Sequence, residues 1–322
     1  MRYRTLGSRR VSVLCMGTLP FGSVVDGPTS FALLDRFVER GGTFIDTANC
    51  YCFWRDGSDG GDSERLVGRW LADRGLHDEI TVATKIGALP SGDGEWPGNR
   101  EGLAPGTVRT AVEGSLRRLG RDTVDLLYGH IDDPATPLEE STGAFAQLVS
   151  DGLVDQIGMS NQSAPRFAAA RDIAHGAGLP SFAAIQQRHT YLPPAPEADF
   201  DYQVALDDEM LAYAAAHQDV TVLAYSSLLN GAYSGAKPVP PEYRHDATDT
   251  SLRVLADVAR ELGATAGQVV YAWMLQGSPM IVPLVGVSTT AQLDEALDAV
   301  DLKLSDEHVK RLDAARAPVS GA

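Results

Sequence analysis

The feature that most constrains the fold is a regular alternation of short apolar runs with amphipathic segments along the 322 residues. Seven apolar runs follow residue 42, including TFID, ITVAT, VDLLYG and VTVLAY, and an eighth lies at 12–16. Runs that are apolar throughout are typical of strands buried on both faces, as in parallel sheets covered by helices. Eight strand–helix units in a chain of this length favour an α/β fold of the closed (β/α)8 TIM-barrel type over an open sheet.

Both ends of the chain predict additions to the barrel. Residues 2–16 contain two short extended pieces around Gly7 and Ser8, which predicts an N-terminal β-hairpin. Amphipathic segments near 290–299 and 305–316 follow the last apolar run and predict extra C-terminal helices. No linker and no shift in composition divides the chain, so we expect one domain over residues 1–322.

Charge and cysteine content argue against several functional classes. The chain has 27 Lys and Arg against 43 Asp and Glu, a net charge of −16, which disfavours nucleic acid or an anionic membrane as partner. No window reaches the roughly 18 apolar residues of a membrane span, so we expect a protein of the reducing cytoplasm. Composition carries no signal for an oligomeric state. The three cysteines, Cys15, Cys50 and Cys52, lack the spacing of a disulfide framework or metal site, and we expect no metal.

Polar side chains stand at the carboxyl ends of six different apolar runs. These residues are Asp46, Lys85, His130, Asn161, Gln186 and Tyr225. In (β/α)8 barrels the rim that they would share holds the active site. Each alone also has a structural interpretation, because Asp caps turns, Lys is usually solvated and His satisfies core hydrogen bonds. Their convergence on one rim favours a functional site.

Four residues near this rim predict a proton donor: Asp46, Tyr51, Lys85 and His130. A phenol has a pKa near ~10 and is a poor acid at neutral pH unless its phenolate is stabilised. A lysine ammonium beside the phenol lowers that pKa, and an aspartate holds the ammonium in place. A neutral histidine orients a carbonyl oxygen. By itself, Tyr51 could simply be an aromatic side chain in a surface loop. Together, the four groups suit a site that donates a proton to the oxygen of a carbonyl compound whose carbon receives a hydride.

At these residues the chain resembles the aldo-keto reductase family. The family's Asp-x4-Tyr signature is matched by Asp46 and Tyr51, its lysine by Lys85 in VATKIG, and its histidine by His130 in LLYGHIDD. Further matches are GMSN, Gln186, AYSSL and VPLVGVSTTAQLDE. The resemblance implies a TIM barrel that reduces an aldehyde or ketone with NADP(H), or catalyses the reverse oxidation. It also implies that Tyr51 is the general acid.

The resemblance further implies where the cofactor binds. It places the nicotinamide carboxamide on Ser160, Asn161 and Gln186, and the nicotinamide ring against Tyr225. The other expected cofactor contacts lie in the Gly-rich loop, the pyrophosphate segment and the adenosine end: Gly17, Thr18, Ser226, Leu228, Gly231, Lys237, Gly286, Ser288, Gln292 and Glu295. Ser288 lies next to the start of an expected helix, where backbone N–H groups favour a phosphate.

Two departures from the family pattern bear on the choice of cofactor. The arginine that the family often has near Ser288 is absent, and Ala296 stands in place of a common asparagine. The resemblance implies NADP(H), and because of these two departures NAD(H) stands as the alternative. Thr289 and Gln292 also have capping-box spacing, which gives Gln292 a structural interpretation beside its adenine contact.

Three loops, 52–62, 87–105 and 189–203, are expected to wall the substrate pocket. The candidate substrate contacts on them are Trp54, Trp96, His189 and Tyr191. Aromatic walls with several polar groups suit a sugar-like or natural-product carbonyl compound, and plain surface loops are the competing interpretation.

Two other functional classes compete with a carbonyl reductase. A cofactor-bound regulatory subunit would keep the fold with incidental turnover, but a binding role needs no proton donor. A metal-dependent hydrolase would use His130, Asp132 and Asp133, but the multi-histidine ligand set of such sites is missing. The sequence therefore favours an oxidoreductase that acts on a small-molecule carbonyl substrate.

Overall fold

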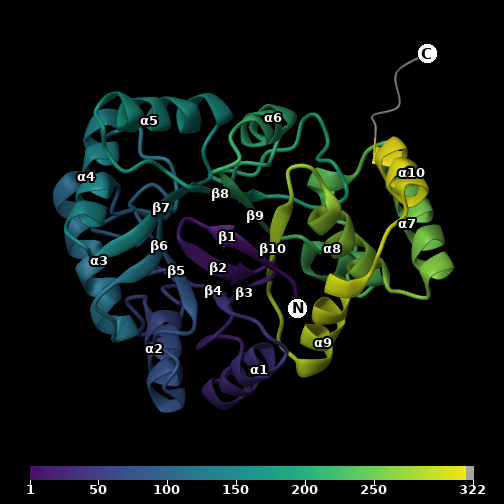
Figure 1. Cartoon of the computed structure of the whole chain (residues 1–322), viewed down its shortest axis with the longest axis horizontal. Helices are drawn as coiled ribbons and strands as arrows, with labels where there is room; N and C mark the ends of the chain where they lie inside the picture. The colour runs from purple at the N-terminus through teal and green to yellow at the C-terminus, as the bar shows by residue number, and fades with distance from the viewer. Residues whose placement is uncertain (317–322) are drawn as a thin grey trace.

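A closed barrel of eight parallel strands forms the centre of the molecule (Figure 1). The computed structural model describes residues 1–316. Around the barrel the strands follow the order β10-β3-β4-β5-β6-β7-β8-β9, which confirms the (β/α)8 expectation. Their bounds are β3 (Cys15–Gly17), β4 (Phe44–Asp46), β5 (Thr81–Ile86), β6 (Val124–Gly129), β7 (Val154–Ser160), β8 (Ala184–Arg188), β9 (Thr221–Tyr225) and β10 (Ile281–Val285).

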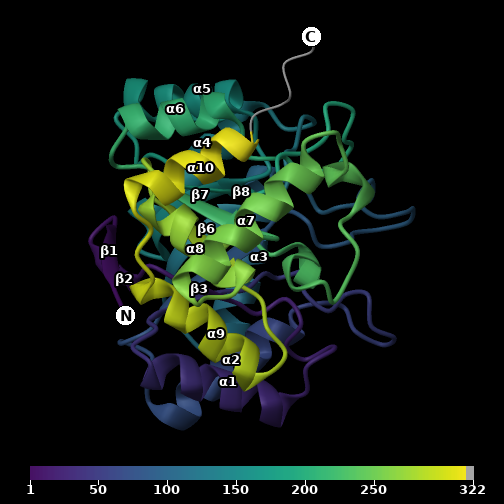
Figure 2. The same ribbon diagram turned by 90° about the vertical axis from the view of Figure 1, so that its right-hand side faces the viewer.

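Helices cover the outer face of the barrel (Figures 1 and 2). They are α1 (Gly27–Glu39), α2 (Asp62–Arg74), α3 (Pro105–Leu119), α4 (Leu138–Ser150), α5 (Ala164–Gly176), α6 (Asp208–Ala216), α7 (Thr248–Leu262), α8 (Ala266–Gln276), α9 (Thr290–Asp298) and α10 (Asp306–Arg316), with the short 3-10 helices η1 (Leu229–Ser234), η2 (Pro241–Tyr243) and η3 (Ala299–Asp301). Local chemistry sets their ends: Asp26 caps α1 by accepting from Thr29 N, and Gly75 ends α2 in the left-handed conformation. None of the helices within residues 1–316 has the length and apolar character needed to cross a bilayer.

The N-terminal hairpin closes one end of the barrel (Figures 1 and 2). Its strands are β1 (Tyr3–Leu6) and β2 (Arg9–Ser12), paired antiparallel. Leu6 and Val11 are buried in a cluster with inward-facing residues of the barrel strands such as Phe44. Because Ser12 N also bonds the Thr43 side chain, just before β4, the hairpin lies at the amino ends of the strands. The carboxyl ends therefore form the open mouth.

Two strand boundaries differ from the expectation. The run expected as one strand at 12–16 is split, because Ser12 ends β2 and the barrel strand β3 begins at Cys15. β8 continues past Gln186 to Arg188, since Arg188 still pairs with Tyr225 of β9. Gln186 therefore lies inside its strand rather than at the end.

Candidate active site

The carboxylate, ammonium and phenol expected to act together lie in direct contact. Lys85 Nζ lies 2.8 Å from Tyr51 Oη and also donates to the Asp46 carboxylate. It donates to the Thr47 carbonyl oxygen at 2.8 Å as well. Asp46 is fully buried, Lys85 is 1% exposed and Tyr51 is 7% exposed. All three ammonium hydrogens are thus bonded inside the protein, and the Tyr51 oxygen is one of the acceptors.

The pairing of β4 with β5 fixes this contact. After β4 the chain stays beside β5, because Thr47 N donates to Ala83 O at 2.9 Å. Two residues later, Asn49 N donates to Lys85 O at 3.0 Å. The loop is thereby held against β5 until it delivers Tyr51 to the lysine.

Burial and charge set the proton affinities of the pair. Burial raises the pKa of Tyr51 above that of an ordinary phenol, and the Lys85 ammonium, which lowers this pKa, offsets only part of the rise. The lysine thus acts in the expected direction, but burial is the larger effect. Burial alone would lower the pKa of Lys85, yet the Asp46 carboxylate and the phenol raise it above its usual value. At neutral pH the phenol keeps its proton and the lysine its charge.

His130 follows β6 and approaches Tyr51 edge-on, with ring centroids 6.0 Å apart. Burial, and then the charge of Lys85, hold the pKa of His130 well below its usual value, so the imidazole is neutral. Its Nδ1 lies 3.5 Å from Cys50 Sγ, a contact that no sequence spacing indicated. With Nδ1 against the thiol, Nε2 is the ring nitrogen left to face a ligand.

The second oxygen of the Asp46 carboxylate is held from across the barrel. Gln186 Nε2 donates to Asp46 Oδ2 at 2.9 Å. The sequence indicated only a cofactor contact for Gln186. The contact with Asp46 was missed because inward-facing residues of β4 and β8 meet only once the barrel closes.

Asn161 joins the ends of neighbouring strands at the mouth. Its Nδ2 donates to His130 O at 2.9 Å, and its Oδ1 accepts from Tyr225 Oη at 2.6 Å. Its φ of 57° lies in the left-handed region, which asparagine tolerates better than most residues. Ser160 Oγ donates to Gln186 O at 2.8 Å. The structure therefore brings together the four residues expected around a nicotinamide and bonds them to one another.

The segment after β9 has an unusual backbone. Ser226, Leu229 and Asn230 have φ of 59°, 48° and 54°, and Gly231 has φ of 96°. Consecutive left-handed residues other than glycine are strained and cluster at ligand-binding sites. Lys237 is exposed further along the same segment. The residues expected to face a pyrophosphate thus share one sharply turning loop.

The residues expected at the adenosine end lie just before α9 and along it. Thr289 caps the helix by accepting from Gln292 N. Gln292 Oε1 accepts from Ser288 N at 2.9 Å rather than from Thr289 N, so Gln292 supports the start of the helix without completing a capping box with Thr289. Glu295 Oε1 accepts from Thr265 Oγ1 at 2.5 Å. Ser288 itself is exposed.

Thr18 is a correction to the expected cofactor contacts. It is fully buried, and its hydroxyl donates to Asp46 O at 2.9 Å and contacts Ser63 Oγ at 2.8 Å. The enclosed Thr18 side chain therefore supports the strand that carries Asp46 and is not open to a cofactor. Its neighbour Gly17 ends β3.

An aromatic wall stands beside Tyr51. The Trp54 ring centroid lies 6.5 Å from that of Tyr51, and Phe53 lies 5.4 Å from both Trp54 and Trp96. Tyr202 packs edge-on against Trp96 at 4.7 Å. The two tryptophans lie where the sequence analysis placed them. Phe53 and Tyr202 were missed, although both lie within loops expected to wall the pocket.

His189 and Tyr191 do not join this wall, which corrects the expectation that they contact substrate. Tyr191 is fully buried, and its hydroxyl donates to Leu312 O at 3.1 Å. His189 stacks on Trp273 of α8, with ring centroids 5.7 Å apart. The chain after β8 first packs against α8 and α10 and only then returns to the mouth at Tyr202.

The carboxylates next to His130 have structural partners. Asp132 Oδ1 accepts from Arg166 Nε at 2.6 Å, and Asp133 Oδ2 accepts from Leu103 N at 2.7 Å. These bonds anchor loops at the mouth. Among the described residues 1–316, no group of three or more His, Cys, Asp or Glu side chains is arranged to hold a metal ion.

Comparison with known proteins identifies the family. The model of the aldo/keto reductase family matches residues 13–317. The chain belongs to the aldo/keto reductase family. The norsolorinic acid reductase stcV of Emericella nidulans is 32% identical over 328 residues, covering 96% of this chain and 79% of that protein. A Schizosaccharomyces pombe aldo-keto reductase, yakc, whose name includes NADP(+), is 28% identical over 99% of this chain and 93% of its own length.

A solved structure supports the same assignment. The crystal structure of a thermostable aldo-keto reductase with the inhibitor epalrestat matches with a TM-score of 0.76 and 27% identity. The match covers 98% of this chain and 100% of that one. This aldo-keto reductase is accordingly an oxidoreductase of carbonyl compounds that uses a nicotinamide cofactor.

Proposed function

We propose that this aldo-keto reductase uses NADP(H) to reduce an aromatic aldehyde or ketone, with Tyr51 as the proton donor. The observation that carries the proposal is the 2.8 Å hydrogen bond from Lys85 Nζ to Tyr51 Oη. Because the phenol oxygen accepts from the ammonium, its own hydrogen points away from Lys85. Within residues 1–316 this hydrogen has no protein acceptor, so it is available to a carbonyl oxygen at the mouth.

The neighbouring residues have distinct roles in this proposal. Lys85 stabilises the negative charge that develops on the Tyr51 oxygen as its proton leaves. Asp46, held by Gln186 at 2.9 Å, keeps the ammonium in position. His130, neutral at working pH, donates a hydrogen bond from Nε2 to the same carbonyl oxygen and orients it.

The chain's donor set fits a nicotinamide dinucleotide. Hydroxyl and amide groups gather at Ser160 and Asn161 beside the Tyr225 ring, which would hold the nicotinamide. The left-handed segment after β9, with Lys237, would take the pyrophosphate. When bound, the nicotinamide supplies the hydride.

The preference for NADP(H) rests on the other end of this site. Ser288 lies at the amino end of α9, where backbone N–H groups and the helix dipole favour a phosphate. One relative carries NADP(+) in its name. We propose that this helix start, without an arginine nearby in sequence, binds the 2′-phosphate.

The aromatic wall supports the substrate class. Trp54 is 46% exposed beside Tyr51, and Phe53, Trp96 and Tyr202 continue the wall. Aromatic pairs contribute about 0.5–1.5 kcal/mol beyond the area that they bury. A flat aromatic carbonyl compound suits this wall better than a sugar, whose hydroxyls need polar partners.

The substrate class is tested with benzaldehyde and cyclohexanecarbaldehyde, which share a carbon skeleton but differ in aromaticity. Consumption of NADPH is followed by absorbance, and the ratio of the two kcat/KM values is compared between the wild type and Trp54→Ala. Because the ratio is compared between the wild type and the variant, the difference in intrinsic reactivity between the two aldehydes cancels. We expect the ratio to fall about fivefold in the variant. An unchanged ratio would contradict the aromatic assignment.

Cofactor preference is tested separately by quenching of the protein's fluorescence. NADPH should bind more tightly than NADH, and Ser288→Asp, which places a negative charge at the phosphate position, should reduce that preference. A wild-type protein that binds NADH as tightly as NADPH would contradict the proposed NADP(H) preference and leave the role of Tyr51 intact.

A further inference from the structure

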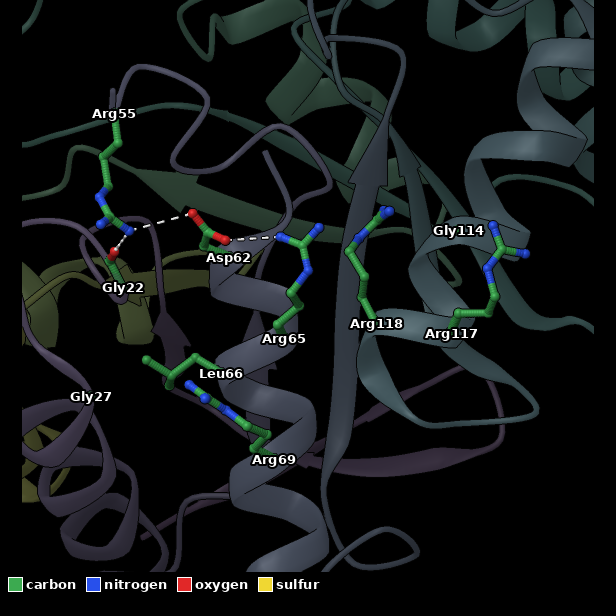
Figure 3. A pocket seen from close by; sticks show the side chains of 10 residues that line it. All are labelled: Gly22, Gly27, Arg55, Asp62, Arg65, Leu66, Arg69, Gly114, Arg117 and Arg118. Atoms are coloured by element: carbon green, nitrogen blue, oxygen red, sulfur yellow. Dashed lines mark hydrogen bonds and ion pairs between the residues drawn. The ribbon is translucent and has the colours of Figure 1, made fainter. Parts of the chain in front are cut away.

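A concavity of roughly 730 Å³ lies on the side of the barrel, beside α2 and α3 (Figure 3). No residue of the Asp46, Tyr51, Lys85 and His130 cluster lines it. Five arginines line it instead: Arg55, Arg65, Arg69, Arg117 and Arg118. They come from the loop after β4, from α2 and from the end of α3. We call this concavity the arginine cleft.

Glycines allow the arginines to gather. A Cβ on Gly68 of α2 would lie 2.6 Å from Arg118 O, so the two helix backbones meet there more closely than any side chain permits. A Cβ on Gly61 would lie 2.5 Å from Arg118 Cδ, and one on Gly114 would lie 3.0 Å from Arg118 Nη1. Gly68 thus allows the two helices to approach each other, and Gly61 and Gly114 leave room for the Arg118 side chain between them.

Three of the five arginines have protein partners. Arg118 Nε donates to the buried Glu64 carboxylate at 2.5 Å, and Arg65 Nη1 donates to Asp62 at 2.8 Å. Arg55 Nη1 donates to Gly22 O at 2.5 Å (Figure 3). These bonds fix the positions of three guanidinium groups in the cleft.

The other two arginines are unmatched. Within the described 316 residues, Arg69 and Arg117 form no ion pair and no side-chain hydrogen bond, and both are exposed. Arg69 lies four residues after Arg65 on α2, and Arg65 already pairs with Asp62 at 2.8 Å and with Asp59 at 3.6 Å. Asp62 is the one carboxylate among the lining residues. The cleft therefore carries a net positive charge, whereas the whole chain has a net charge of −16.

We propose that the arginine cleft binds a small polyanion that carries two or more phosphate or carboxylate groups. Guanidinium groups pair with both kinds of oxyanion in a two-pronged geometry. The size of the cleft lies in the range of small-molecule sites. Arg65 and Arg118 lie in the middle of the site, and Arg69 and Arg117, which point to opposite sides of it (Figure 3), supply the unmatched charges. Because the ligand binds only the folded protein, its binding also stabilises the fold.

Calorimetric titration with inorganic tripolyphosphate tests the proposal at low ionic strength, with and without saturating NADPH. We expect binding in both conditions, a higher thermal unfolding midpoint in its presence, and weaker binding as salt is added. The double variant Arg69→Ala/Arg117→Ala should bind about tenfold more weakly. Arg253→Ala, which removes an exposed arginine from α7, is the matched control and should bind as the wild type does.

Two further probes define the ligand. Inorganic monophosphate should bind much more weakly than tripolyphosphate, since it presents one group only. Citrate in place of tripolyphosphate distinguishes the two anion classes, because tighter citrate binding assigns carboxylates and tighter tripolyphosphate binding assigns phosphates.

Four results would overturn the proposal. They are no binding to the wild type, equal binding by the double variant, equal weakening by Arg253→Ala, and displacement of tripolyphosphate by NADPH. The last result would place the anion in the cofactor site. Binding of monophosphate as tightly as tripolyphosphate would overturn the requirement for two or more groups.

Discussion

Lys85 donates all its ammonium hydrogens inside the protein, and this explains the electrostatics of the mouth at the scale of single residues. The buried charge is stable because Asp46 compensates it, and Asp46 is itself held by Gln186. The Tyr51 oxygen accepts a hydrogen bond from the lysine, and its own hydrogen is directed toward the mouth. The direction of this one phenol hydrogen is what the proposed chemistry depends on.

The sequence predicted some of these residues and not others, for a physical reason. Asp46, Lys85 and His130 each end a continuous apolar run, and strand ends share one rim in a parallel barrel. The contacts of Cys50 with His130 and of Gln186 with Asp46 depend on side-chain directions inside the closed barrel. No spacing along the chain reports those directions.

Because His189 is buried, we predict that the free energy of unfolding depends on pH. Burial, and then the charge of Arg316, lower its pKa from 6.5 to about 3. Below about pH 6.5 the unfolded chain binds a proton that the folded chain does not, so stability falls as the pH drops from about 6.5 toward 3. The loss is about 1.4 kcal/mol for each pH unit.

The variant His189→Phe isolates this contribution. It keeps the stacking on Trp273 and removes the titrating group, whose Nε2 has no hydrogen-bond partner within residues 1–316. Urea unfolding at pH 7 and pH 5.5 should show a smaller loss of stability in the variant than in the wild type. Equal losses in the two proteins would rule out His189 as the source.

At the scale of elements, strands were predictable and loops were not. The apolar runs located the barrel strands to within a few residues, because burial on both faces leaves a continuous signal. The ends of β3 and β8 were missed, since pairing with neighbouring strands sets them. Tyr191 and Tyr202 lie in one loop and look alike in sequence, but only the path of the loop sends one to α10 and the other to the mouth.

The contact between α2 and α3 gives a prediction for Gly68. A Cβ there would meet the backbone of α3, at 2.6 Å from Arg118 O, and backbone cannot move aside as a side chain does. Gly68→Ala should lower the free energy of unfolding by about 1–3 kcal/mol, measured by urea denaturation.

Gly143 provides the matched control, since it also lies within a helix but an added Cβ would meet nothing within 4 Å. Gly143→Ala should stabilise the protein by about 0.5–1 kcal/mol, because alanine is the better helix former. If both substitutions stabilise the protein, the result would contradict the close approach of α2 and α3 at Gly68.

At the scale of the whole molecule, the hairpin that packs into the barrel and the residues of the proposed active site lie at opposite ends of the barrel. The hairpin closes the amino ends of the strands, with Leu6 only 1% exposed, while the proposed site lies at the carboxyl ends. The alternation of apolar and amphipathic segments sufficed to predict this architecture. It did not predict that the hairpin buries side chains inside the barrel, because two short extended pieces carry no signal for what they cover.

Leu6→Ala tests this separation. Removing a fully packed leucine should lower the free energy of unfolding by about 2–4 kcal/mol, with kcat/KM unchanged at temperatures where the variant is folded. Leu19→Ala is the control, because Leu19 is 51% exposed and its loss should change stability by less than about 0.5 kcal/mol. A large loss of kcat/KM in the folded Leu6→Ala protein would contradict the separation.

The proposed proton donor is tested most directly by Tyr51→Phe, which keeps the ring and removes only the hydroxyl. NADPH-dependent reduction of 4-nitrobenzaldehyde and NADPH binding by fluorescence quenching are measured on the same preparation. We predict that kcat falls by about a hundredfold to ten-thousandfold while the affinity for NADPH stays within about twofold of the wild type. Turnover of Tyr51→Phe at the wild-type rate would contradict the proposed role of Tyr51.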